Sequence, residues 1–215
     1  MPDPIRVDIV SDVVCPWCIV GFLQLRAACA QAGFTIEVFW HPFELNPQMP
    51  PEGQNLRAHI TEKYGTTAEQ SDRSRDQLRA LGQSLGFAFK FSDTTRMHNT
   101  FLAHQLIMEA GQHGKAHAMK MALFAAHFSV NQEIADTAVL ADLAEGVGLD
   151  RATVLRVLQD GTHAKAVRAE QAFWTSKGIS GVPAMIFDQK YLVTGAQGIE
   201  NYVQILQQVE TARAA

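Results

Sequence analysis

The stretch Cys15-Pro16-Trp17-Cys18 directly follows an apolar run, Ile5 to Val10, and opens a segment with helical spacing. Two cysteines at this spacing can close a small disulfide at a helix start without moving the backbone. Unpaired backbone N–H groups and the helix dipole favour a thiolate at the first cysteine. Pro16 suits the first helical turn, where an N–H would have no intrahelical partner. The stretch therefore predicts a redox-active dithiol, with Cys15 as the accessible, acidic thiol and Cys18 as a shielded one.

Half of a zinc site is the alternative interpretation of this stretch, but such a site needs a second pair of ligands. Only Cys29 remains, and the sequence has no second CxxC and no compact Cys/His box. Cys29 lies eleven residues after Cys18, which is about 16 Å along a helix, so the two cannot pair. We expect no metal site, and we expect Cys29 to be a buried apolar residue.

Composition and charge exclude several classes of function. The 215 residues are 47% hydrophobic and 19% charged, an ordinary globular balance. A formal net charge of -4 offers no basic footprint for nucleic acid, and the apolar stretches are too short to cross a membrane. The N-terminal segment has neither the basic nor the apolar region of a signal peptide. We therefore expect a cytoplasmic protein, in which a CxxC is more often catalytic than structural.

Hydrophobic periodicity predicts an α/β fold with a large insertion. The residues from Ile5 to Val10 and from Thr35 to Trp40 read as strands, and Pro16 to Ala32 as a helix ended by Gly33. Strand signals return only at Ala184–Phe187 and Tyr191–Thr194, before a last amphipathic helix. Between them we expect helices near residues 54–64, 67–85, 97–110, 115–128, 137–147, 151–159 and 163–177. We thus expect one sheet domain, residues 1–43 plus 178–215, and an all-helical insertion, residues 44–177.

A second motif, Gly181-Val182-Pro183, stands just before the third expected strand. A proline fits the first residue of a strand because it cannot donate to the ladder. It is either a loop proline that launches the strand, or a cis-proline opposite the CxxC that exposes the Val182 backbone to an extended substrate. We expect the cis form, within van der Waals reach of the Cys15 sulfur.

These motifs together resemble the DsbA-like thioredoxin-fold oxidoreductases, and most closely their FrnE-like branch. The resemblance covers nearly the whole chain. Its motifs are Ser11-Asp12-Val13-Val14 with the CPWC and Gly21, Trp40 with Pro42-Phe43, Leu45-Asn46-Pro47, Asn99, Ala103-His104, Leu123-Phe124, Phe128, and the segments 178–183 and 195–197. His41 stands where many relatives carry arginine.

The resemblance implies a thioredoxin fold with an inserted helical domain, and thiol–disulfide oxidoreductase activity on protein or small-molecule thiols and disulfides. Cys15 would be the nucleophile, Cys18 the resolving thiol and Pro183 the cis-proline, with Val182 and Trp17 binding substrate. No cofactor is implied beyond glutathione as a redox partner.

Trp17 carries no positive charge, so it should stabilise a Cys15 thiolate less than a histidinium would. We expect a potential less oxidising than that of a periplasmic oxidant; Trp17 is equally well explained as an apolar lip. His104, Asn99 and Gln197 are candidates for lining a cleft, although a core histidine is the simpler interpretation of His104. His113 and His117 have ligand-like spacing, but we interpret them as surface residues.

Two other functions compete with disulfide exchange. Glutathione-dependent isomerases and transferases of the hydroxychromene-carboxylate isomerase and kappa-class types resemble the same fold. They carry serine where Cys15 stands, and they offer glutathione an acidic residue that Gly195-Ala196-Gln197-Gly198 lacks. A non-catalytic holdase is the third class, and it needs a large exposed apolar patch.

Overall fold

The structure is a computed structural model, and it describes residues 3–214. The chain divides into two compact units. The first, the sheet unit, contains the part of the chain up to Leu45 and the part from Ala169 on. The second, the helical unit, is Asn46–Arg168.

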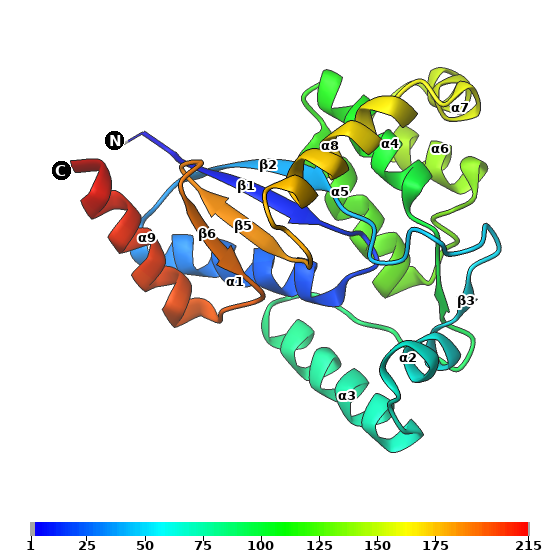
Figure 1. The fold of residues 1–215 in the computed structure, drawn as a ribbon, viewed down its shortest axis with the longest axis horizontal. Helices are drawn as coiled ribbons and strands as arrows, with labels where there is room; N and C mark the ends of the chain where they lie inside the picture. The colour runs from blue at the N-terminus through cyan, green and yellow to red at the C-terminus, as the bar shows by residue number, and fades with distance from the viewer. Residues whose placement is uncertain (1–2, 215) are drawn as a thin grey trace. The chain divides into compact units, whose positions relative to one another are not determined.

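The sheet unit has four strands in the order β2-β1-β5-β6 (Figure 1). They are β1 (Ile5–Ser11), β2 (Ile36–Pro42), β5 (Ala184–Phe187) and β6 (Tyr191–Thr194). β1 pairs with β2 in parallel and with β5 antiparallel, and β5 and β6 form a hairpin. Helices α1 (Pro16–Ala32) and α9 (Ile199–Ala214) pack against each other in this unit. This is the thioredoxin fold that the sequence predicts.

Local sequence signals explain why α1 begins and ends where it does. Cys15 is the N-cap in an extended conformation, and Pro16 occupies the first turn. Gly33 ends the helix in the left-handed region at φ 74°, where its N–H donates to the carbonyl of Cys29. Ten residues of α1 are buried, which fits a helix packed on more than one side.

The helical unit contains α2 (Leu56–Tyr64), α3 (Ala68–Ser84), α4 (Phe101–Gln112), α5 (Ala116–Ala125), α6 (Thr137–Gly146), α7 (Arg151–Asp160) and the first part of α8 (Ala164–Ser176). Asp136 and Asp150 accept backbone N–H groups at the starts of α6 and α7. Such caps satisfy donors that have no partner inside the helix, and they confirm the predicted starts of both helices.

Two details of the helical unit differ from the sequence expectation. A two-residue ladder joins β3 (Gln54–Asn55) to β4 (Arg96–Met97), and α5 continues into a π-helical turn, η1 (Ala126–Val130). Two-residue strands are too short to give an alternating pattern, so periodicity cannot reveal them. The insertion is helical as expected, with this one small ladder in addition.

The division within α8 also differs from the expected boundary at residue 177. The sheet unit begins again at Ala169, inside the helix. Trp174 explains why, since it packs against a buried cluster of Val10, Ile179 and Ala184. The C-terminal half of α8 therefore belongs to the sheet unit.

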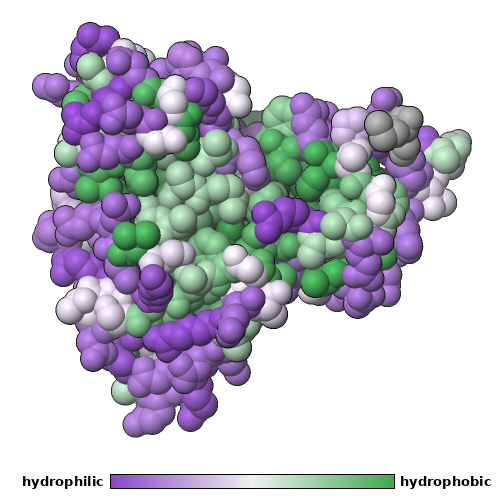
Figure 2. All heavy atoms as spheres, turned by 180° about the vertical axis from the view of Figure 1, so that it is seen from behind, coloured by the Kyte–Doolittle hydropathy of each residue, from purple (hydrophilic) through white to green (hydrophobic). Residues whose placement is uncertain are grey.

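The exposed surface carries both hydrophilic and hydrophobic residues, as the colouring of Figure 2 shows. Large exposed hydrophobic residues among those described are Trp17, Tyr64, Val130, Phe173, Tyr191 and Leu192. Within residues 3–214, no helix combines the length and hydropathy that a membrane span requires.

Candidate active site

The CxxC lies where β1 gives way to α1. Cys15 donates its backbone N–H to the carbonyl of Asp12 at 3.2 Å, and Cys18 donates its own to the carbonyl of Cys15 at 3.1 Å. These bonds form a tight turn before the first full turn of α1. The turn keeps the two cysteines adjacent at the helix N-terminus, as the sequence predicts, and neither is in a disulfide bond.

The Val182–Pro183 segment meets this turn. Its peptide bond is cis, and the Cys15 thiol donates to the carbonyl oxygen of Val182 at an Sγ–O distance of 3.6 Å. The register of the sheet explains the meeting, because Val10 near the end of β1 pairs with Ala184 at the start of β5. Residues 167 positions apart are thus brought into contact.

Two consecutive hydrogen bonds link Pro183 to Gly195 and Gly195 to Tyr202. The backbone N–H of Gly195 donates to the carbonyl of Pro183 at 2.8 Å. Tyr202, fully buried on α9, donates its hydroxyl to the carbonyl of Gly195 at 3.2 Å and lies 3.4 Å from the sulfur of Met185. Burial raises the pKa of Tyr202 to about 12, so the hydroxyl stays protonated and remains a donor.

Gly21 on α1 completes this packing. A Cβ at this position would lie 3.2 Å from the terminal methyl of Met185 and 3.5 Å from the ring of Pro183. The first distance is tighter than ordinary van der Waals contact, so the absence of a side chain lets α1 approach the proline strand. In the sequence Gly21 stands out only as part of the opening motif, and the structure explains it by this close approach.

The acidity and exposure of Cys15 differ from the sequence expectation. The hydrogen bond with the Cys18 side chain and burial both raise the pKa of Cys15 well above the ordinary thiol value. Cys15 is only 3% exposed, against 0% for Cys18. Two thiols in contact resist ionising together, and burial disfavours the thiolate further, so these effects outweigh the helix N-terminus. Cys29 is buried as expected, and burial raises its pKa to about 11.

Asp12 is a buried acidic residue that the sequence showed only as part of the motif. One carboxylate oxygen accepts the N–H of Leu45 at 2.7 Å, and the other accepts the N–H of Val14 at 3.5 Å. Its charge adds to the causes that raise the pKa of Cys15. The sequence signal for this role is the place of Asp12, a charged residue three positions before the first cysteine of the CxxC.

Among the expected substrate-contacting residues, Trp17 is 47% exposed and Val182 is half-buried, so both are open to solvent. Gln197 lies in the loop between β6 and α9, and its amide donates to the carbonyl of Thr194 at 2.6 Å. That bond stabilises the loop, which is also the one that contains Gly195.

Asn99 and His104 belong to the helical unit. The side chain of Asn99 donates to the carbonyl of Met49 at 2.8 Å and accepts the N–H of Phe101 at 3.0 Å, so it joins a loop to the start of α4. His104 is buried on α4 at 2% exposure, consistent with a core histidine. His113 and His117 are exposed, as expected. Among the described residues, no group of three or more His, Cys, Asp or Glu side chains is placed to hold a metal ion.

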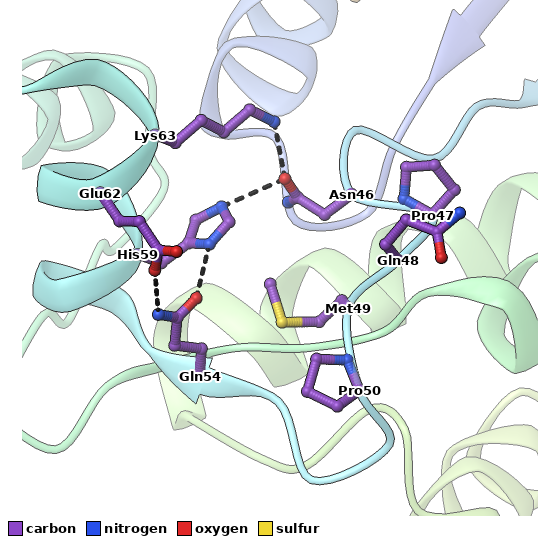
Figure 3. Close-up of a pocket in the computed structure, with 9 residues that line it drawn as sticks. All are labelled: Asn46, Pro47, Gln48, Met49, Pro50, Gln54, His59, Glu62 and Lys63. Atoms are coloured by element: carbon purple, nitrogen blue, oxygen red, sulfur yellow. Dashed lines mark hydrogen bonds between the residues drawn. The ribbon is translucent and has the colours of Figure 1, made fainter.

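The helical unit has a pocket of its own, which the sequence did not suggest (Figure 3). Its volume is about 400 Å³. The side-chain oxygen of Asn46 accepts from Lys63 at 2.6 Å and lies 3.1 Å from a ring nitrogen of His59, whose other nitrogen faces Gln54 at 2.9 Å. Burial and the charge of Lys63 lower the pKa of His59. Because these groups satisfy one another, we interpret the network as one that fixes the loop after residue 45.

Comparison with known proteins identifies the family. The model of the DSBA-like thioredoxin domain matches residues 6–207, so the chain belongs to this family of thiol oxidoreductases. The uncharacterized protein YwbO of Bacillus subtilis is 29% identical over 197 residues, which are 90% of this chain and 92% of YwbO.

Solved structures agree with this assignment. The crystal structure of the probable DsbA oxidoreductase SCO1869 from Streptomyces coelicolor has 34% sequence identity and a TM-score of 0.89, covering 96% of this chain and 90% of that one. A 2-hydroxychromene-2-carboxylate isomerase has 14% identity and a TM-score of 0.68, covering 97% and 96%. At that identity the similarity concerns the fold alone.

Proposed function

We propose that this protein is a thiol–disulfide oxidoreductase that uses Cys15 as the attacking thiol and Cys18 as the resolving thiol. Its substrates are disulfides of proteins or small molecules. The observation that carries the proposal is the position of the Cys15 sulfur, 3.6 Å from the carbonyl oxygen of Val182 and one helical turn from Cys18, a second thiol that is not in a disulfide. An extended substrate could pair with the Val182 backbone while its sulfur meets Cys15, with Trp17 as an apolar contact.

The reaction needs only the two thiols and the substrate. The Cys15 thiolate attacks a substrate disulfide, forms a mixed disulfide and releases one substrate thiolate. Cys18, on losing its proton, attacks the Cys15 sulfur, forms the Cys15–Cys18 disulfide and releases the second substrate thiolate. The substrate is reduced by two electrons, and the released thiolates take up the two protons.

We propose reduction of substrates as the favoured direction. A strong oxidant of this kind has a stabilised reduced form. Here the pKa of Cys15 is raised by Cys18 and by burial, so a free thiolate is not stabilised. A thiol of high pKa forms less thiolate at neutral pH, but that thiolate is a stronger nucleophile.

Glutathione is the proposed redox partner. Two glutathione molecules would return the Cys15–Cys18 disulfide to the dithiol, yielding glutathione disulfide, with no bound cofactor. We place this activity in the cytoplasm, where the glutathione pool is reducing.

Three variants test the reaction in an insulin-reduction assay and in refolding of a scrambled disulfide protein. Cys15→Ser should abolish activity, whereas Cys18→Ser should accumulate mixed disulfides, because attack survives and resolution does not. Cys29→Ser is the matched control, since Cys29 lies away from the turn, and its activity should equal that of the wild type. Isomerisation of a hydroxychromene substrate with glutathione is measured alongside. A wild type that isomerises but exchanges no disulfides, with Cys15→Ser still active, would contradict the proposal.

A further inference from the structure

The sheet unit has a second pocket, with a volume of about 490 Å³, which we call the hairpin pocket. It lies among β1, β2, the C-terminal half of α8 and the β5–β6 hairpin. All its lining residues belong to the sheet unit: Arg6, Asp8, His41, Glu170, Phe173, Trp174, Lys177, Ile179, Ile186, Gln189 and Leu192. Neither Cys15 nor Cys18 lines it, and the proposed disulfide exchange assigns it no role.

An ionic network occupies one side of the hairpin pocket. Asp8, 2% exposed, accepts two hydrogen bonds from Arg6 at 2.8 and 2.7 Å. His41 lies between two carboxylates, with one ring nitrogen 2.8 Å from Asp8 and the other 2.5 Å from Glu170. Burial raises the pKa of Asp8, but the hydrogen bonds from Arg6 and His41 outweigh it, and the net pKa is lowered. Both carboxylates are therefore already engaged.

The other side of the pocket is apolar and open to solvent. Phe173 is 50% exposed and Leu192 is 52% exposed, and both line the pocket. Trp174, Ile179 and Ile186 lie deeper and join the buried cluster around Val10. Large exposed hydrophobic residues that share a concave surface are typical of ligand sites.

Lys177 supplies a second positive charge to the lining. In the described part of the chain its ammonium has no ion-pair partner, and it lies 5.5 Å from the centre of the Phe173 ring. Arg6 has further N–H donors beyond the two that Asp8 accepts. Arg6 and the two carboxylates of the lining are thus each paired, and the charge that forms no ion pair among the described residues is the cation of Lys177.

We propose that the hairpin pocket binds a small amphipathic anion: a carboxylate whose oxygens face Lys177 and Arg6 and whose apolar body lies on Phe173, Ile186 and Leu192. The volume falls within the roughly 300–1,000 Å³ that small-molecule pockets occupy. An apolar wall with a few convergent polar groups is the composition that such sites have. An aliphatic or aromatic carboxylate has the charge and the apolar surface that this lining complements.

Decanoate is a suitable probe, and titration calorimetry with the full-length chain measures its affinity. Lys177→Gln removes the ammonium and Leu192→Gln makes the apolar wall polar, so each should weaken decanoate binding at least 5-fold. Lys165→Gln changes an exposed lysine of α8 outside the pocket, and it should bind decanoate as the wild type does. Insulin reduction should be unchanged in all three, which separates this proposal from the proposed function.

A second readout locates the ligand. The chain has three tryptophans, and their indole N–H signals are resolved by two-dimensional NMR, with Trp174 assigned from Trp174→Phe. Decanoate should shift the Trp174 signal and leave that of Trp17 in place. The proposal is overturned if decanoate binding does not saturate, or if Lys177→Gln binds it as tightly as the wild type. A wild-type dimer that Leu192→Gln dissociates in sedimentation velocity would also overturn it, because a second copy would then cover the pocket.

Discussion

Replacing Tyr202 by Phe removes a single hydroxyl from the chain of contacts behind the proline strand. That hydroxyl donates to the carbonyl of Gly195, and Gly195 in turn donates its N–H to the carbonyl of Pro183. The phenyl ring keeps the packing of a fully buried side chain, so the change isolates the hydrogen bond. We therefore expect a stable, folded variant with a looser proline strand.

The magnitude follows from the partners of the hydroxyl. A buried hydrogen bond contributes about 1 kcal/mol, and a carbonyl left without its donor adds to the loss, so the free energy of unfolding should fall by roughly 1–2 kcal/mol. The sulfur of Met185 is a weak acceptor and adds little. For a chain of this size, that loss lowers Tm by roughly 2–8 °C.

Calorimetry and insulin reduction together test this prediction. Tyr202→Phe should lose stability and also exchange disulfides several-fold more slowly, because the Val182 carbonyl beside Cys15 is less well positioned. Tyr191→Phe is the matched control, since Tyr191 is 43% exposed on the edge strand β6, and it should change neither quantity. If Tyr202→Phe has the Tm and the exchange rate of the wild type, the hydroxyl does not hold the proline strand.

Three further predictions concern packing, thiol acidity and acid stability. Gly21→Val places a branched side chain against Met185, so the free energy of unfolding should fall by about 1–3 kcal/mol and disulfide exchange should slow. A Tm equal to that of the wild type would exclude the close approach. The rate at which an alkylating reagent modifies reduced Cys15, mapped by mass spectrometry, should reach half its maximum above pH 9. In Cys18→Ala the midpoint should lie at a lower pH, because the main cause of the raised pKa of Cys15 is removed. A wild-type midpoint below pH 7 would contradict this. The hydrogen bond from His163 lowers the pKa of Glu109, so its stabilisation is present above the ordinary carboxyl value of 4.5 and is lost as pH falls below it. Glu109→Gln should therefore flatten the fall in Tm between about pH 5 and 3, and an unchanged acid slope would rule out this contribution.

The elements with strong local signals could be predicted from the sequence. Helix α1 runs over the expected residues, Pro16–Ala32, because a proline begins it and Gly33 stops it. The strands β5 and β6 also match, since a short polar turn separates two β-rich runs. The CxxC at the start of α1 and the Val182-Pro183 pair before β5 are the motifs that indicate the thioredoxin fold.

What the sequence did not reveal depends on contacts between distant segments. Tyr202 lies on the apolar stripe of α9, and nothing local distinguishes it from a core residue that makes no hydrogen bond. Asp8 offered a signal, a charge within an apolar strand, but its partner His41 comes from β2. The expected acidity of Cys15 failed for a related reason, because helix position was visible and burial was not.

The order of the chain has a consequence for the site. The CxxC is complete within the first βαβ unit, but the carbonyl that faces Cys15 belongs to Val182, beyond the whole helical unit. β5 can reach β1 only by pairing antiparallel beside it, and the register Val10–Ala184 then fixes where the proline stands. The insertion can vary in length without disturbing that register, because loop-closure entropy grows only slowly with length. The position of the two cysteines is thus encoded locally, whereas the contact between Cys15 and the Val182 carbonyl exists only once β5 has paired with β1.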